Sequence, residues 1–134
     1  MTPRPKIAQQ AHAVPAADEV SELLRDFAEP LLYADPSGPS DIETVRTAMM
    51  LAMICWNLPV YEAQGSPLYA QGKRTLEAIA AQVPGHVTSA LKKLVEERKS
   101  TLASMPYLVL VEVEGSTPQN AIVRAEARRA RPSS

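Results

Sequence analysis

The side chains best suited to nucleophilic chemistry in this sequence are one cysteine, Cys55, and two histidines, His12 and His86. A thiol becomes a nucleophile when a neighbouring imidazole or cation favours its thiolate form. Cys55 instead ends an unbroken apolar run over residues 48–55, and such surroundings raise the pKa of a thiol and leave it unreactive. His12 belongs to a polar amino-terminal segment, and His86 is expected at an exposed helix start. The sequence therefore predicts no catalytic pair.

Metal and phosphate sites have no more support than a catalytic pair. The histidines and the cysteine provide none of the close spacings, such as H-x-x-x-H, H-E-x-x-H or C-x-x-C, that hold a metal ion. The five glycines form neither G-x-G-x-x-G nor G-x-x-x-x-G-K, the patterns that cradle phosphate groups. We therefore expect a protein that is not an enzyme and that has neither a cofactor nor a metal site.

The most distinctive dipeptide is Trp56-Asn57, directly after the apolar run. In one interpretation Trp56 anchors the core and the Asn57 amide satisfies polar groups at the end of a helix. In the other, Trp56, Asn57 and Tyr61 line a surface for a protein partner, because Trp and Tyr are concentrated in binding hot spots. The first interpretation is favoured and predicts that Trp56 is largely buried, while residue types alone leave the second one open.

Two helices are predicted in the first half of the chain. Apolar residues at helical spacing predict an amphipathic helix from Asp18 that Pro30 should kink or split. Ser40 and Glu43 form a capping-box pattern, which predicts the start of a second helix that contains the apolar run and ends before Pro59. Because that run is apolar on every side, we expect this helix to be surrounded on all sides.

The second half of the chain changes from helical to alternating periodicity. We expect a loop over residues 61–75, a short helix over 76–83 and a longer helix over 87–102. Apolar and polar residues then alternate over 109–113 and again over 121–127, which predicts two strands joined by a turn. The expected fold class is α+β, with about four N-terminal helices packed around an apolar central helix and a C-terminal antiparallel β-hairpin.

Length and composition predict a single small domain. A chain of 134 residues can bury one core, and its lone cysteine excludes an internal disulfide. We expect loose tails over residues 1–17 and 129–134, with one domain over 18–128. The amino end carries no apolar leader segment, so we expect a cytoplasmic protein. The apolar run is well short of the roughly 20 residues that a membrane-spanning helix needs, so no membrane association is expected.

Charge is distributed unevenly along the chain. Residues 18–72 hold nine acidic and two basic side chains, whereas residues 73–134 hold ten basic and six acidic ones. An acidic half and a mildly basic half suit contact with an oppositely charged protein partner or with a second copy of the chain.

The segment TLEAIAAQVPGHVTSALKKLVEER and the hairpin after it, residues 75–128, resemble a winged helix-turn-helix in the order of their elements. The resemblance implies binding to a nucleic-acid backbone through Lys92, Lys93, Arg98, Lys99, Arg124 and Arg128. The segment departs from the motif at Pro84, where a buried aliphatic residue is usual. The start of the would-be recognition helix, HVTSA, also has no Arg, Lys, Asn or Gln to read bases.

A second resemblance covers most of residues 24–128. FAEPLL, then WN at the end of an apolar helix, then RK before a strand, are similar in order to marks of small uncharacterised bacterial α+β domains. This resemblance implies a fold and no activity. The sequence as a whole favours a non-enzymatic interaction or adaptor domain that binds a protein partner or forms a homo-oligomer, with nucleic-acid binding as the alternative.

Overall fold

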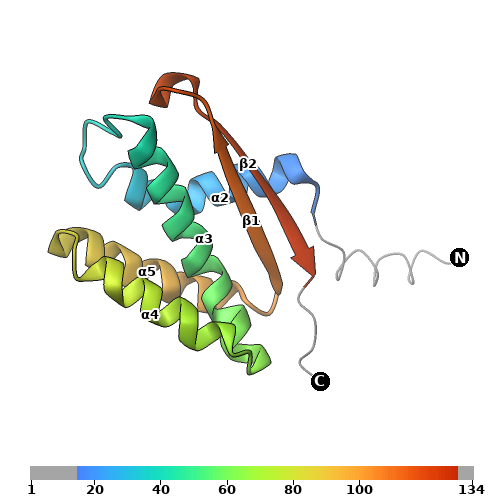
Figure 1. Cartoon of the computed structure of the whole chain (residues 1–134). Coiled ribbons are helices and arrows are strands. Elements are labelled where there is room, and N and C mark those ends of the chain that lie inside the picture. The colour runs from blue at the N-terminus through green and yellow to red at the C-terminus, as the bar shows by residue number, and fades with distance from the viewer. Residues whose placement is uncertain (1–14, 130–134) are drawn as a thin grey trace, which may run out of the picture.

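The structure is a computed structural model, and it describes residues 15–129 (Figure 1). Most of the two expected tails lies outside these residues. The elements in chain order are α2 (Ala17–Leu32), α3 (Ile42–Gln64), α4 (Leu68–Ala80), α5 (Gly85–Thr101), β1 (Tyr107–Glu114), a short 3-10 helix (Pro118–Asn120) and β2 (Ile122–Arg129). Helices followed by one C-terminal hairpin confirm the expected α+β fold.

The helices form a layer on one face of the hairpin. β1 and β2 are antiparallel, with Tyr107 opposite Arg129 at one end and Glu114 opposite Ile122 at the other. α2 packs against β2, and α3 packs against β1. Figure 1 shows α4 and α5 side by side beyond α3, away from the hairpin. α3 is therefore the central element, because it touches the hairpin and every other helix.

Side chains from both ends of the chain meet in one core around α3. The buried apolar residues include Val20, Leu24 and Ala28 of α2, Val45, Met49, Ala52, Cys55 and Trp56 of α3, Leu91 and Leu94 of α5, and Tyr107, Val109 and Ala125 of the hairpin. The predicted burial of Cys55 and Trp56 is confirmed. The expectation that the apolar run is covered on all sides is wrong, because Met50 is 42% exposed. The hairpin, α2, α4 and α5 pack against α3 but leave Met50 uncovered.

Both prolines expected to end or break a helix lie inside one. α3 continues past Pro59 to Gln64, where Gly65 ends it in the left-handed conformation (φ 65°). α2 likewise continues past Pro30 to Leu32. A proline within a helix removes one backbone hydrogen bond. For Pro59, which is itself buried, packing around the helix outweighs that cost.

The start of α3 differs from the expected capping box. Asp41, not Ser40, is the N-cap, and its Oδ1 accepts hydrogen bonds from the Thr44 N–H at 2.8 Å and the Thr44 hydroxyl at 2.7 Å. The Glu43 carboxylate, which the pattern assigned to the cap, pairs with Arg46 at 2.7 Å instead. The Asp41 carboxylate accepts hydrogen bonds from both the backbone N–H and the hydroxyl of Thr44. Glu43 is therefore not needed at the cap and can pair with Arg46.

The predicted loop over residues 61–75 is wrong for most of its length. α3 ends at Gln64 and α4 already begins at Leu68, so only three residues connect them. Gly72 lies in the middle of α4, where a Cβ would be 3.0 Å from the side chain of Leu58. Glycine is a poor helix former, but here its small size lets α4 approach α3 closely. A prediction based on local composition cannot detect this contact between Gly72 and Leu58.

The hairpin carries a cross-strand charge pair. Arg124 and Glu114 form an ion pair at 3.2 Å on the face that points away from the helices. The turn is held by Asn120, whose Oδ1 accepts hydrogen bonds from the N–H groups of Ser116 and Thr117. In the part of the chain that the structure describes, no helix is long and apolar enough to cross a membrane.

The buried thiol of Cys55 should make the protein less stable at alkaline pH. Burial raises the pKa of Cys55 from its ordinary value of 9.0 to about 12. The unfolded chain therefore loses this proton near pH 9 while the folded chain keeps it. Between pH 9 and about 12 stability falls as pH rises, by about 1.4 kcal/mol per pH unit from this group.

This effect can be measured by urea unfolding at a series of pH values. Cys55→Ala lowers stability at neutral pH, but its free energy of unfolding should fall less steeply than that of the wild type above pH 9. Parallel slopes for the two proteins would show that the Cys55 thiol is not sequestered.

Candidate functional site

Asn57 is buried in the middle of α3, and its side chain pairs with the edge of β1. Its Nδ2 donates to the Val109 carbonyl at 3.0 Å, and its Oδ1 accepts from the Val109 N–H at 2.8 Å. Alternate residues of an edge strand direct both backbone groups away from the partner strand. Asn57 therefore occupies the place that a further strand would take.

The opposite edge of the hairpin is closed in a similar way by α2. The Ser21 hydroxyl accepts a hydrogen bond from the Ala125 N–H at 2.8 Å, and it lies 2.8 Å from the Ala17 carbonyl, to which it donates. Exposed strand edges invite pairing with other chains, and side chains that cover an edge prevent it. Both edges of this hairpin are thus tied to helices near their middle.

Arg98 is the one fully buried charged residue among residues 15–129. Its Nε donates to the Trp56 carbonyl at 2.9 Å, and its Nη2 donates to the Tyr107 carbonyl at 3.1 Å. The guanidinium lies 3.8 Å from the centre of the Trp56 ring, in a cation–π stack. Its Nη1 donates to the Thr101 hydroxyl at 3.1 Å. The guanidinium group of Arg98 therefore contacts α3, the end of α5 and the start of β1.

The buried charge of Arg98 is stabilised by carbonyl oxygens, a hydroxyl and an aromatic ring, and not by a carboxylate. Burial lowers the pKa of Arg98 to about 10, so the side chain still carries its charge at neutral pH. Two carbonyl oxygens and an aromatic face replace the hydration that the guanidinium loses. The Tyr107 carbonyl also accepts a hydrogen bond from Trp56 Nε1 at 2.9 Å, so Trp56 and Arg98 share one acceptor. We call Trp56, Asn57 and Arg98 the buried cluster.

The buried cluster decides between the two interpretations of the Trp56-Asn57 pair. Trp56 is 2% exposed and Asn57 is 6% exposed, and the polar atoms of both bond to β1. Neither side chain presents a surface to a partner, which corrects the interpretation of this pair as a partner surface. Tyr61, the third residue of that hypothesis, is half-buried one turn further along α3.

The basic residues proposed for nucleic-acid binding do not share one surface. Lys92, Lys93 and Lys99 are exposed on α5. Arg98 is withdrawn from this set as a correction, because its guanidinium is buried within the fold. Arg124 and Arg128 lie on the outer face of the hairpin and pair with Glu114 at 3.2 Å and Glu126 at 3.3 Å. The layer of α2 and α3 separates that face from α5 (Figure 1).

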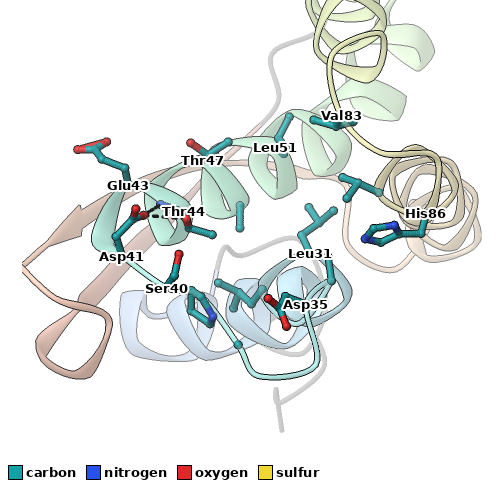
Figure 2. A pocket seen from close by; sticks show the side chains of 16 residues that line it. Leu31, Asp35, Ser40, Asp41, Glu43, Thr44, Thr47, Leu51, Val83 and His86 are labelled. Carbon is teal, nitrogen blue, oxygen red and sulfur yellow. Dashed lines mark hydrogen bonds between the residues drawn. The ribbon is translucent and has the colours of Figure 1, made fainter.

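A first pocket, of about 470 Å³, lies where the end of α2, residues 33–41 and the starts of α3 and α5 meet. Two of the carboxylates that line it accept hydrogen bonds from residues two or three positions later in the chain. Hydrogen bonds from Ser37 lower the pKa of Asp35, and hydrogen bonds from Thr44 lower the pKa of Asp41. Figure 2 shows His86 at the opposite end of this pocket from Asp41. Asp35 lies nearer to His86 (Figure 2), but among the described residues His86 forms no hydrogen bond or ion pair with either carboxylate.

A second pocket is a groove between α4 and α5, with α3 at its base and a volume of about 500 Å³. Its apolar lining comes from Leu58 of α3, Leu76 and Ala80 of α4, and Leu91 and Val95 of α5. Its rim carries Lys73 and Glu77 on one wall and Lys92, Glu96 and Lys99 on the other. An apolar base with a charged rim is typical of surfaces that bind an amphipathic helix. We call this the α4–α5 groove.

Sequence reasoning missed the α4–α5 groove because it assigned the first half of α4 to a loop. A signal was present: Tyr69, Gly72, Leu76 and Ile79 recur three or four residues apart and continue the helical face predicted from Leu76 onward. The two glycines and one proline of that segment outweighed this spacing in the prediction.

Metal-binding side chains form no cluster in the part of the chain that the structure describes. No set of three or more histidine, cysteine or carboxylate side chains within residues 15–129 could hold a metal ion. Comparison of the chain with known protein families, curated proteins and solved structures finds no match. Inference about function therefore depends on the surfaces of the molecule itself.

Asn57→Leu should remove about 2–4 kcal/mol of stability. Leucine has a similar size, but it leaves both the N–H and the carbonyl of Val109 without their buried partner. Ser21→Ala is a matched control, because it opens the other edge of the hairpin at a less buried position. It should cost about 1 kcal/mol, since water can replace the hydroxyl there. Urea unfolding measures both, and equal losses would show that the Asn57 contact is no stronger than the Ser21 contact.

Proposed function

We propose that this protein is a non-enzymatic interaction domain that binds an α-helix of a protein partner, or of a second copy of itself, in the α4–α5 groove. The observation that carries the proposal is the exposure of α4. None of its 13 residues is buried, although it carries Leu68, Leu76 and Ile79. Leu76 and Ile79 are only partly covered by the core, and a helix of this kind beside an apolar groove provides a site that another helix can complete.

The energetics of α4 support this assignment. An isolated helix of this length is marginal in water, so it depends on packing for its stability. α4 packs on α3 through Gly72 but makes only a few contacts with α5. A partner helix in the groove would bury the half-exposed Leu76 and Val95 and would stabilise α4 as it binds.

The charges on the rim indicate what kind of helix fits. The rim carries charges of both signs, with three basic side chains, Lys73, Lys92 and Lys99, and two acidic ones, Glu77 and Glu96. Glu96 is already paired with Lys99 at 3.2 Å. Complementary charge raises association rates and selects partners. A helix with an apolar stripe and charges of both signs on its flanks therefore suits the groove.

The sequence expectation of a cytoplasmic bacterial protein belongs to the same proposal. A single buried thiol needs no oxidising compartment, and an interaction domain of this size acts by docking with other proteins.

A synthetic amphipathic helix can test the groove directly. An 18-residue peptide with leucines at heptad spacing and both lysines and glutamates on its flanks should bind with micromolar affinity, and its NMR shift changes should centre on Leu58, Leu76 and Val95. Val95→Glu should weaken binding at least tenfold, because it places a charge in the apolar base of the groove.

Leu110→Glu is the control, because it adds the same charge at an exposed position on the hairpin face away from the helices. It should bind the peptide like the wild type. Shift changes that centre on the first pocket or on the hairpin, or no binding at millimolar peptide, would contradict the proposal.

A further inference from the structure

Four residues form a line along the side of α4 next to the groove: Ala70, Lys73 and Glu77, which are exposed, and Ala80, which is partly buried. They are spaced three, four and three residues apart, so they follow one side of the helix. Lys73, Glu77 and Ala80 border the α4–α5 groove, and Ala70 extends the line toward the start of the helix. We call these residues the α4 stripe.

The α4 stripe has a symmetric order: a small residue, a positive one, a negative one and a small residue. When two identical helices pack antiparallel about a two-fold axis, each residue meets the one at the mirrored position of the other copy. With the axis level with residue 75, Lys73 of each copy meets Glu77 of the other, and Ala70 meets Ala80. The same patch then complements itself, as a two-fold interface requires.

We infer that the occupant of the α4–α5 groove is α4 of a second copy of this chain, in an antiparallel two-fold dimer held by two reciprocal Lys73–Glu77 ion pairs. This inference depends on the proposed function and names the partner of the same groove. Each α4 would lie against the α4 and α5 of the other copy, which gives a four-helix arrangement at the centre of the dimer.

Lys73 and Glu77 are available for such pairs. Within the described chain neither forms an ion pair, whereas Glu96 and Lys99 on the opposite wall do. Lysine four residues before glutamate is the less favourable order for a pair within one helix. The Lys73 ammonium instead lies 6.0 Å from the centre of the Tyr69 ring. Both charges therefore remain exposed and unpaired in the single chain.

The size and shape of the surface suit a weak dimer. At 1.5 Å per residue, α4 and α5 are about 20 Å and about 25 Å long, and two adjacent helices give a face about 20 Å wide. A face of these dimensions has a projected area of about 400–500 Å² per partner, which is below the roughly 800 Å² of a standard interface and corresponds to a weak, reversible dimer. Ala70 and Ala80 leave room for the two α4 helices to approach within the usual 8–10 Å or so.

Another self-contact, between acidic α2 and basic α5, fits less well. The apolar residues Val20, Leu24 and Ala28 of α2 are already buried in the core, so α2 can offer mainly charges. A contact between different surfaces of two copies also leads to open chains rather than a closed pair. α4 differs because it has partly exposed apolar residues and also two charges, Lys73 and Glu77, that can pair with the opposite charges of a second α4.

Sedimentation equilibrium of charge-reversal variants tests the inference. The wild-type protein should dimerise, and Lys73→Glu or Glu77→Lys should each weaken dimerisation at least tenfold, because each single change opposes like charges twice. The double variant Lys73→Glu/Glu77→Lys should restore dimerisation to within about threefold of wild type. Arg74→Glu is the matched control, because it makes the same charge change on a different side of α4.

Circular dichroism confirms that each variant is folded before its association is measured. A wild-type protein that stays monomeric at 0.5 mM would overturn the inference, and so would a dimer that the single reversals leave intact or that the double variant does not restore. If the wild type is monomeric but binds the peptide, the proposed function of the groove stands and the dimer inference fails. If the wild type neither dimerises nor binds the peptide, both the proposed function and the dimer inference fail.

Discussion

The stacking of the Arg98 guanidinium on Trp56 is the interaction on which the rest of this structure depends. Arg98 comes from α5, its two main hydrogen bonds end on the carbonyls of Trp56 in α3 and Tyr107 in β1, and Trp56 Nε1 shares the Tyr107 acceptor. Three elements therefore meet at one cation. A buried charge is costly unless it is solvated by the protein, so this arrangement is stable only when all three elements are in place.

The buried cluster also determines which surfaces remain for association. Asn57 and Ser21 each bond to the middle of one hairpin edge, so addition of a strand from another chain is disfavoured. Most apolar residues of α2, of α3 and of the inner hairpin face are already buried in the core or packed against it. No residue of α4 is buried, and the α4–α5 groove lies beside it, which is why we propose this groove as the surface that binds a helix.

Residue patterns predicted the elements whose own periodicity is strong. The hairpin, the helices from α2 to α5 and the burial of Cys55 and Trp56 follow from local spacing. Helix continuation through Pro59 and the early start of α4 did not, because packing against distant residues overrides local preference there. Arg98 was grouped with Lys99 as surface charge, although its spacing from Leu91 and Leu94 places it on the buried side of α5. Only the distant Trp56 ring and Tyr107 carbonyl make that position tolerable for a cation.

Substitution of Arg98 by lysine tests the central role of this interaction most directly. Lysine keeps the charge but loses the planar group that stacks and bonds in two directions. The free energy of unfolding in urea should fall by about 2–4 kcal/mol, and the near-ultraviolet circular dichroism of Trp56, the single tryptophan, should weaken. Lys99→Met, the control at the exposed neighbour, should change stability by no more than about 0.5 kcal/mol. An Arg98→Lys protein as stable as the control, with an unchanged Trp56 signal, would contradict this account.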